Sequence, residues 1–133
     1  MLALRPVSAR RGGSATIPLA MVTISILYPQ TPGSTFDMTY YLERHMPMSL
    51  ARLRSHPGFI ALSVERGMAA PGSDVAPAYV AMCHYRFKTA DDFVAAFTPH
   101  ALELQGDMPN YTTITPIVQF SAVELTAMSE TRP

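Results

Sequence analysis

The alternation of apolar and polar positions predicts four strands in this chain. Between residues 21 and 29 every second side chain is apolar or aromatic, which is typical of a half-buried strand. These side chains are Val22, Ile24, Ile26 and Tyr28, and we expect them to face the helices. Similar patterns predict strands over residues 59–66, 78–87 and 117–126.

A first helix is predicted over residues 36–54. Ser34 lies three residues before Asp37, which indicates a helix start with a carboxylate near the positive end of the helix. Pro47 lies inside this helix and lacks the amide hydrogen that the helical ladder needs. We therefore expect a kink around His45 or two helical pieces.

A second helix is predicted to begin after Thr89 and to end at Gly106, with a kink at Pro99. Its apolar stripe also places His100 in the core. The stripe consists of Phe93, Phe97, His100 and Leu104.

The order β-α-β-β-α-β predicts an α+β, ferredoxin-like fold with one antiparallel sheet and both helices on one face. Apolar residues occupy both parities of the strands, Met82 and Leu62 among them, so we expect a homodimer that covers the second face by two-fold symmetry. Residues 21–126 form the predicted domain, and residues 127–133 form a C-terminal tail. Residues 1–20 are either a disordered tail or an extension before the true start at Met21.

Composition narrows the function classes. The 133 residues are 48% hydrophobic, and ten Lys and Arg balance ten Asp and Glu, which argues against a nucleic-acid partner bound through a basic surface. No apolar stretch is long enough to span a membrane, and we expect a cytoplasmic protein. The one cysteine, Cys83, excludes an internal disulfide framework and is predicted to be inert packing.

Known cofactor and metal motifs are missing from the sequence. HExxH, HxH and CxxC do not occur, and neither do GxGxxG or the phosphate-binding GxxxxGK[ST]. We therefore expect no metal site and no cofactor, although haem held by one axial histidine stays open.

Residues 40–47 read YYLERHMP, which resembles the YYxxxHxP segment of the EthD family in the dimeric α+β barrel superfamily. The resemblance continues through residues 87–93, 107–112 and 116–119 and covers about residues 21–126. It implies a ferredoxin-like subunit, a barrel-forming dimer and a link to the breakdown of ether or aromatic compounds. It implies no single reaction, because the wider superfamily includes cofactor-free monooxygenases, muconolactone isomerase, polyketide cyclases and haem-binding enzymes.

His45 is the first candidate for chemistry, because histidine exchanges protons near neutral pH. Tyr41 lies one helical turn earlier and could share a proton with it. Asp107, in the loop after the second helix, could hold the imidazole in one tautomer. The alternatives are that His45 stabilises the kink, and that Asp107 and Asn110 are turn residues.

A second set of residues is predicted to bind a ligand, although packing would explain each of them singly. Tyr28 would reach the cleft from the end of its strand, and a buried Gln119 would need a polar partner. Met48 belongs to a group of methionines suited to an irregular apolar pocket. The complete set is Tyr28, Met48, Asn110, Tyr111 and Gln119. His84 shares the parity of Met82 and is expected at the dimer interface.

Two functions from different classes fit these residues. The first is a cofactor-independent acid–base enzyme of isomerase, cyclase or dehydratase type, acting on an apolar aromatic or ether-derived compound. The second is a non-catalytic binding or accessory protein for an apolar small molecule in a degradation pathway. A cofactor-free monooxygenase is a third reading, with oxygen uptake as its signature.

Overall fold

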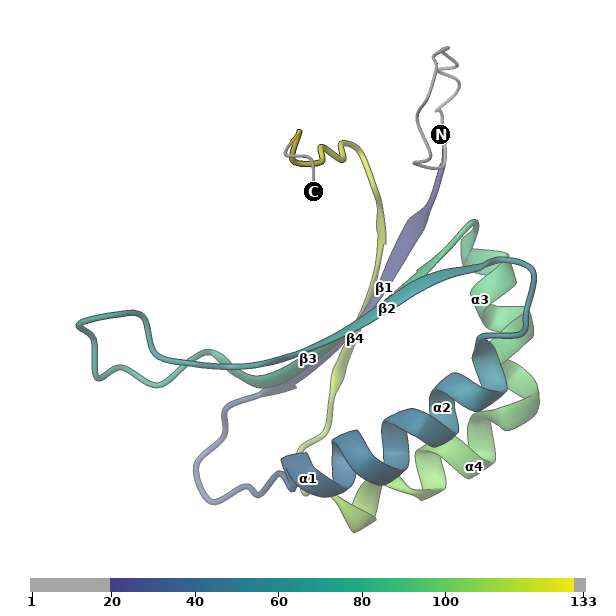
Figure 1. Ribbon diagram of the computed structural model, residues 1–133. Helices are drawn as coiled ribbons and strands as arrows, with labels where there is room; N and C mark the ends of the chain where they lie inside the picture. Colours follow the sequence, from purple (N-terminus) through teal and green to yellow (C-terminus); the bar gives the residue numbers. More distant parts are fainter. Residues whose placement is uncertain (1–19, 131–133) are drawn as a thin grey trace.

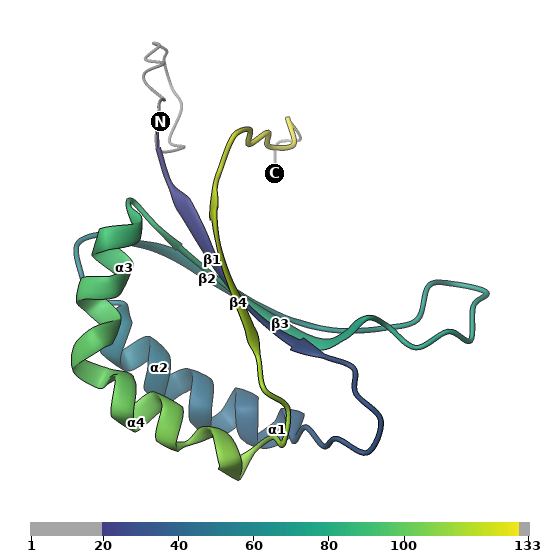
Figure 2. The same ribbon diagram turned by 180° about the vertical axis from the view of Figure 1, so that it is seen from behind.

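The computed structural model describes residues 20–130, in which four antiparallel strands form one sheet and the helices cover one of its faces (Figure 1 and, from behind, Figure 2). The strands are β1 (Val22–Pro29), β2 (Phe59–Arg66), β3 (Tyr79–Phe87) and β4 (Ile117–Ala122), in the spatial order β2-β3-β1-β4. This arrangement confirms the predicted ferredoxin-like fold class. The last strand ends four residues earlier than predicted. The expectation for residues 1–20 falls, apart from Ala20, outside the described residues.

The first helical segment is continuous and is neither broken nor split into two pieces. It runs through α1 (Met38–Tyr40), the π-helical turn η2 (Tyr41–His45) and α2 (Met46–Leu53). The amide of Met46 donates to the carbonyl of Tyr41, five residues back, so the ladder widens where Pro47 follows. A π-turn therefore accommodates the proline, as is common at functional sites.

The start of this helix differs from the prediction. Asp37 is the N-cap, and its side chain accepts a hydrogen bond from the amide of Tyr40 at 3.0 Å. Ser34 belongs to the preceding turn, where its hydroxyl donates to the carbonyl of Thr31 at 2.6 Å.

The second helical segment consists of α3 (Ala90–Phe97), the 3₁₀ turn η3 (Thr98–His100), α4 (Ala101–Gly106) and the 3₁₀ turn η4 (Met108–Asn110). Thr89 caps α3 as predicted, because its side chain accepts from the amide of Asp92. Pro99 falls in the 3₁₀ turn, which replaces a simple kink. His100 is partly exposed, so its prediction as a core residue is wrong.

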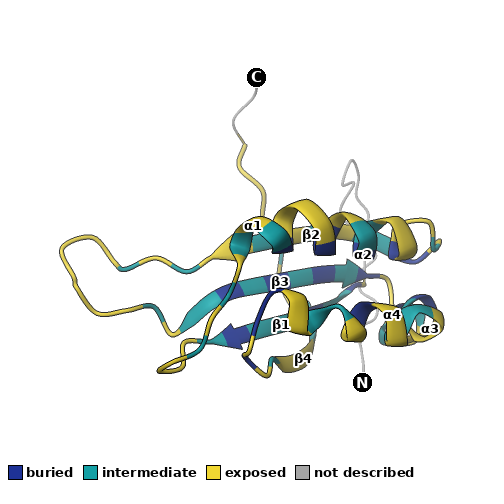
Figure 3. Cartoon of the chain, turned by 90° about the horizontal axis from the view of Figure 1, so that it is seen from below, coloured by how far each residue is buried: buried dark blue, intermediate teal, exposed yellow. Residues whose placement is uncertain are grey.

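The core lies between the sheet and the helices, as the buried segments in Figure 3 show. The helix-facing side of β1 includes Ile24 and Tyr28, and both are buried. On β3 the buried side chains of Tyr85 and Cys83 lie opposite Ile24 and Ile26. The predicted orientation of β1, in which Ile24 and Tyr28 face the helices, is therefore correct.

The outer face of the sheet is polar along much of its length and apolar toward one end. Because Leu62 pairs with Tyr85, it faces the helices and not outward. At the polar part Ser25 and Ser63 flank His84 on the neighbouring strands. The apolar end of this outer face, referred to below as the outer patch, comprises the paired side chains of Leu27, Met82 and Ile117.

Candidate functional site

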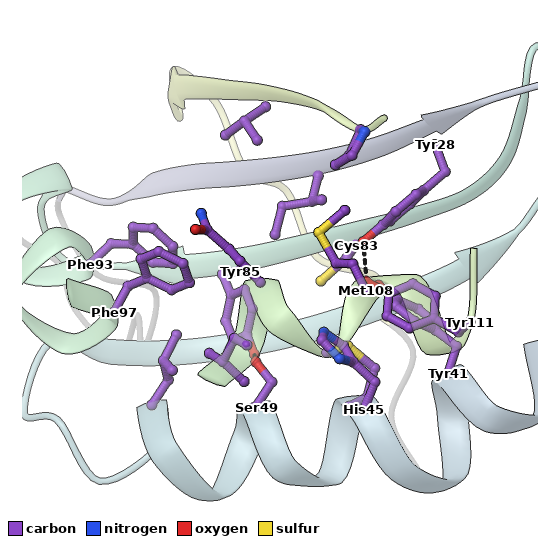
Figure 4. Close-up of a pocket in the computed structure, with 17 residues that line it drawn as sticks. Tyr28, Tyr41, His45, Ser49, Cys83, Tyr85, Phe93, Phe97, Met108 and Tyr111 are labelled. Atoms are coloured by element: carbon purple, nitrogen blue, oxygen red, sulfur yellow. Dashed lines mark hydrogen bonds between the residues drawn. The ribbon is translucent and has the colours of Figure 1, made fainter. Parts of the chain in front are cut away.

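A cavity of about 120 Å³ lies between the sheet and the helices. Figure 4 shows side chains from β1, β3 and α2 converging on it. Most of its walls are apolar, with Ile26, Leu53 and Phe93 among them. Two of its lining side chains, Gln105 and Val118, are exposed, so the cavity reaches solvent beside β4.

His45 contributes an imidazole to this cavity, and its position is fixed by Asp107. The distance from Nδ1 of His45 to Oδ2 of Asp107 is 2.9 Å. An ionised carboxylate only accepts hydrogen bonds, so Nδ1 carries the hydrogen. The neutral imidazole therefore keeps its lone pair on Nε2, the position from which a base acts.

Asp107 is itself held by two further donors. The hydroxyl of Tyr40 donates to its Oδ1 at 2.7 Å, and the side-chain amide of Asn110 donates to the same oxygen at 3.0 Å. Burial opposes ionisation of this carboxyl, but the hydrogen bonds from Tyr40, Asn110 and His45 outweigh it and hold the pKa of Asp107 below its usual value. Asp107 is therefore a carboxylate at neutral pH, placed to balance an imidazolium.

Two tyrosine rings fix the plane of His45. The Tyr41 ring stacks on it with centroids 5.6 Å apart and planes at 11°. The Tyr111 ring packs against it at 4.6 Å. Burial, followed by the proximity of Cys83 and the neighbouring tyrosines, raises the pKa of Tyr41 far above its usual value, so its phenol stays protonated.

The predicted sharing of a proton between Tyr41 and His45 does not hold in this geometry. The hydroxyl of Tyr41 interacts with Tyr28 and Cys83, and in the part of the chain that the structure describes no hydrogen bond joins it to His45. The two rings lie nearly parallel, which brings faces and not polar atoms together. The contact between Tyr41 and His45 is therefore a stack of two rings.

Tyr28 and Tyr111, both predicted to bind a ligand, do line the cavity. Their hydroxyls share a hydrogen bond of 2.8 Å. Burial raises the pKa of each phenol, so both stay protonated at neutral pH. They close one end of the cavity around His45 (Figure 4).

Three predicted ligand-binding residues lie away from the cavity walls. Met48 is partly buried against the core, and Met46 and Met108 line the cavity instead. Asn110 is exposed and acts through Asp107. Gln119 is also exposed.

The position of Gln119 follows from the strand register. It pairs with Ser25, whose parity faces away from the helices, and its side chain donates to the hydroxyl of Ser121 at 3.1 Å. Val118, the adjacent residue, takes the cavity-facing position.

Three site residues escaped the sequence analysis. Tyr40 is one, because Tyr40 and not its neighbour Tyr41 donates to Asp107. Ser49 and Tyr85 are the others, and their hydroxyls are hydrogen-bonded to each other at the cavity wall. Ser49 could have been found, because it continues the four-residue spacing that begins at Tyr41 and His45.

The remaining chemistry of the described region is sparse. Residues 20–130 contain no cluster of three or more His, Cys, Asp and Glu side chains that could hold a metal. Within the same residues no helix is long and apolar enough to cross a membrane. Burial raises the pKa of the Cys83 thiol to about 12, so it is protonated and unreactive at neutral pH.

Comparison with protein-family models and with curated proteins gives no match. Among solved structures, an EthD-like protein from Ralstonia eutropha JMP134 is 43% identical, with a TM-score of 0.70 over 77% of this chain and 90% of that one. A monooxygenase from Streptomyces coelicolor, ActVA-Orf6 in complex with nanaomycin D, is 11% identical, with a TM-score of 0.58 over 84% of this chain and 93% of that one. A putative monooxygenase from Shewanella loihica PV-4 is 14% identical, with a TM-score of 0.53 over 80% of this chain and 97% of that one. The last two likenesses show a shared fold.

Proposed function

Because the chain belongs to the EthD-like family, we propose that it is a cofactor-independent enzyme that acts on an apolar aromatic or ether-derived small molecule. One observation carries this proposal: His45 lines an apolar cavity with its Nδ1 bonded to Asp107, which leaves Nε2 for a bound molecule. That pairing is the arrangement of a general base with its orienting carboxylate.

The chemistry that fits is proton transfer next to a carbonyl group. Nε2 of His45 takes a proton from the carbon beside the carbonyl, and Asp107 balances the imidazolium that forms. The imidazolium then returns the proton, either to another carbon or to a departing hydroxyl. Return of the proton to another carbon completes an isomerisation, and its transfer to a departing hydroxyl completes a dehydration. In a cyclisation the enolate carbon first attacks a second carbonyl of the same molecule, and the proton goes to the alkoxide oxygen that this attack forms. The apolar walls strengthen the electrostatic interactions within the cavity.

A binding protein without catalysis is less well supported by the same geometry. In such a protein His45 would be satisfied by backbone groups, whereas its partner here is a carboxylate that three side chains hold. Oxygenation is the further alternative, since a base in this position could also ionise a phenol, and the ActVA-Orf6 monooxygenase shares the fold.

Hydrogen–deuterium exchange tests the proposed proton transfer without knowledge of the natural substrate. Phenylacetone in D₂O exchanges the protons beside its carbonyl, and NMR follows the rate. We expect the protein to accelerate this exchange, and His45→Ala to lower the acceleration by about 10²–10⁴. His100→Ala, a partly exposed histidine outside the cavity, is the matched control. Exchange that His45→Ala leaves unchanged would contradict the acid–base role, and oxygen uptake with phenols would favour the oxygenase instead.

We further propose that two copies pack through the outer faces of their sheets. The outer patch supports this, because an apolar area on an otherwise polar sheet face is stabilised when a second copy covers it. A subunit of this size also gains stability from such cover.

A further inference from the structure

A second polar group lies in the same cavity, one helical turn from His45. Ser49 projects from the next turn of α2, and Tyr85 reaches it from β3, so that their hydroxyls form a hydrogen bond (Figure 4). Both residues are buried, with 5% and 2% of their surface exposed. Two hydroxyls in an otherwise apolar wall require an explanation, because burying polar groups costs free energy unless they are paired.

The hydroxyls of Ser49 and Tyr85 can form more hydrogen bonds than the one they share. Two hydroxyls carry two hydrogens, and only one hydrogen can lie between the oxygens of Ser49 and Tyr85. Within residues 20–130 neither hydroxyl has another hydrogen-bond partner. One hydroxyl hydrogen and several lone pairs are therefore left for a molecule in the cavity. The hydroxyl of Tyr28 beside His45 differs, because it interacts with Tyr41 as well as with Tyr111.

The size and spacing of the cavity define what could use both polar groups. His45 and Ser49 are four residues apart in the chain, which places their Cβ atoms roughly 5–6 Å apart on one helix face. The cavity has a volume of about 120 Å³ and reaches solvent, and a cavity of about 150 Å³ is known to hold benzene. The rings of Phe93 and Phe97 contribute to its walls. One aromatic ring is the molecule that these dimensions fit.

We propose that the Ser49–Tyr85 pair is the second anchor of the ligand, and that the ligand is a single aromatic ring with oxygen substituents at opposite positions. One oxygen faces Nε2 of His45, and the other exchanges hydrogen bonds with Tyr85 and Ser49. Burial raises the pKa of Tyr85, so this phenol binds as a neutral hydrogen-bonding group. This inference rests on the proposed function for the part that His45 plays.

Calorimetric titration of three simple phenols tests the second anchor. The probes are 1,4-dihydroxybenzene, 1,3-dihydroxybenzene and 4-methylphenol. We expect the wild-type protein to bind the 1,4-isomer about three- to tenfold more tightly than the other two, because it alone satisfies both polar groups. Tyr85→Phe should abolish this preference. Tyr79→Phe, on the same strand but outside the cavity, should keep it.

A double variant distinguishes loss of the second anchor from a folding defect. Ser49→Ala/Tyr85→Phe removes both hydroxyls together, which leaves no buried partner unpaired and is close to neutral for stability. Its preference should be absent as well. The proposal is overturned if either variant keeps the preference, or if the wild-type protein shows none. This readout needs no turnover, so failure of the His45-dependent exchange would refute the catalytic role separately.

Discussion

A histidine lies beside a carboxylate on each side of the sheet, and the surroundings of the two pairs differ. On the helix side His45 and Asp107 are 2.9 Å apart, with side chains 10% and 15% exposed. On the outer face His84 and Glu65 are 3.4 Å apart, with side chains 23% and 51% exposed. Asp107 is held by Tyr40 and Asn110 as well, whereas Glu65 lies on the outermost strand of the sheet.

The surroundings of a histidine, more than the residue types beside it, make it a candidate base. In the inner pair Asp107 takes Nδ1, so Nε2 of His45 is left toward the cavity. In the outer pair both ring nitrogens of His84 are occupied, one by the hydroxyl of Ser25 at 2.8 Å and the other by Glu65. Solvent also weakens an exposed ion pair. These surroundings support the chemistry proposed for the inner face, and the outer patch supports the proposed contact between copies.

The largest expected effect comes from changing the inner carboxylate. Asp107→Asn can still accept a hydrogen bond, but it no longer balances an imidazolium and can present a donor that favours the other tautomer. We expect the His45-dependent exchange of phenylacetone protons to fall by about 10² or more, measured by NMR at pH 7. A rate within twofold of the wild type would remove Asp107 from the mechanism and weaken the contrast between the two faces.

A charge placed in the outer patch tests whether two copies pack through the outer faces of their sheets. Met82→Glu puts a carboxylate opposite Glu65, and burial of that charge between two copies is unfavourable. We expect the dissociation constant of the dimer to rise by about tenfold or more, measured by light scattering over a dilution series.

Val94→Glu is the matched control for this experiment, because Val94 is an exposed apolar residue on α3. Its dimer should be unchanged. If Val94→Glu separates the subunits and Met82→Glu does not, the interface lies on the helix side. The proposal that copies pack through the outer face would then be wrong.

A smaller effect is expected when one donor to Asp107 is removed. The folded-state pKa of Asp107 lies below its unfolded value, so its stabilising contribution is present above about pH 4 and is lost as the pH falls through the folded-state pKa. Tyr40→Phe removes one cause of the lowered pKa. Acid unfolding of this variant should therefore begin at a higher pH than in the wild type, as circular dichroism would show. Tyr79→Phe should unfold in acid over the same pH range as the wild type. If Tyr40→Phe also unfolds over that range, the role given to Tyr40 is contradicted.

The strands and the His45 candidate could be predicted from the sequence because they depend on local periodicity and on a short motif. The path of the first helix could not, because the π-turn before Pro47 is one of several ways to accommodate a proline. Gln119 illustrates another limit. Gln119 shares the parity of Ser121 on β4, but which parity faces the helices depends on how β4 pairs with β1.

Tyr85 shows why the second polar group of the cavity escaped sequence analysis. On an alternating strand a tyrosine is typical of packing, and only the three-dimensional structure brings its hydroxyl to Ser49. The partners are 36 residues apart in the chain, so no local pattern connects them.

The smallest expected effect belongs to the outer pair itself. Glu65→Gln removes the charge that faces His84 but keeps the shape of the side chain, and the pair is exposed enough for water to screen it. We expect the free energy of unfolding to change by no more than about 0.5 kcal/mol and the phenylacetone exchange to stay at the wild-type rate. Denaturant unfolding and the NMR assay, run beside Asp107→Asn, measure both quantities. If Glu65→Gln lowered the exchange as much as Asp107→Asn does, the two pairs would be equivalent, and burial beside the cavity would no longer explain why His45 is the base.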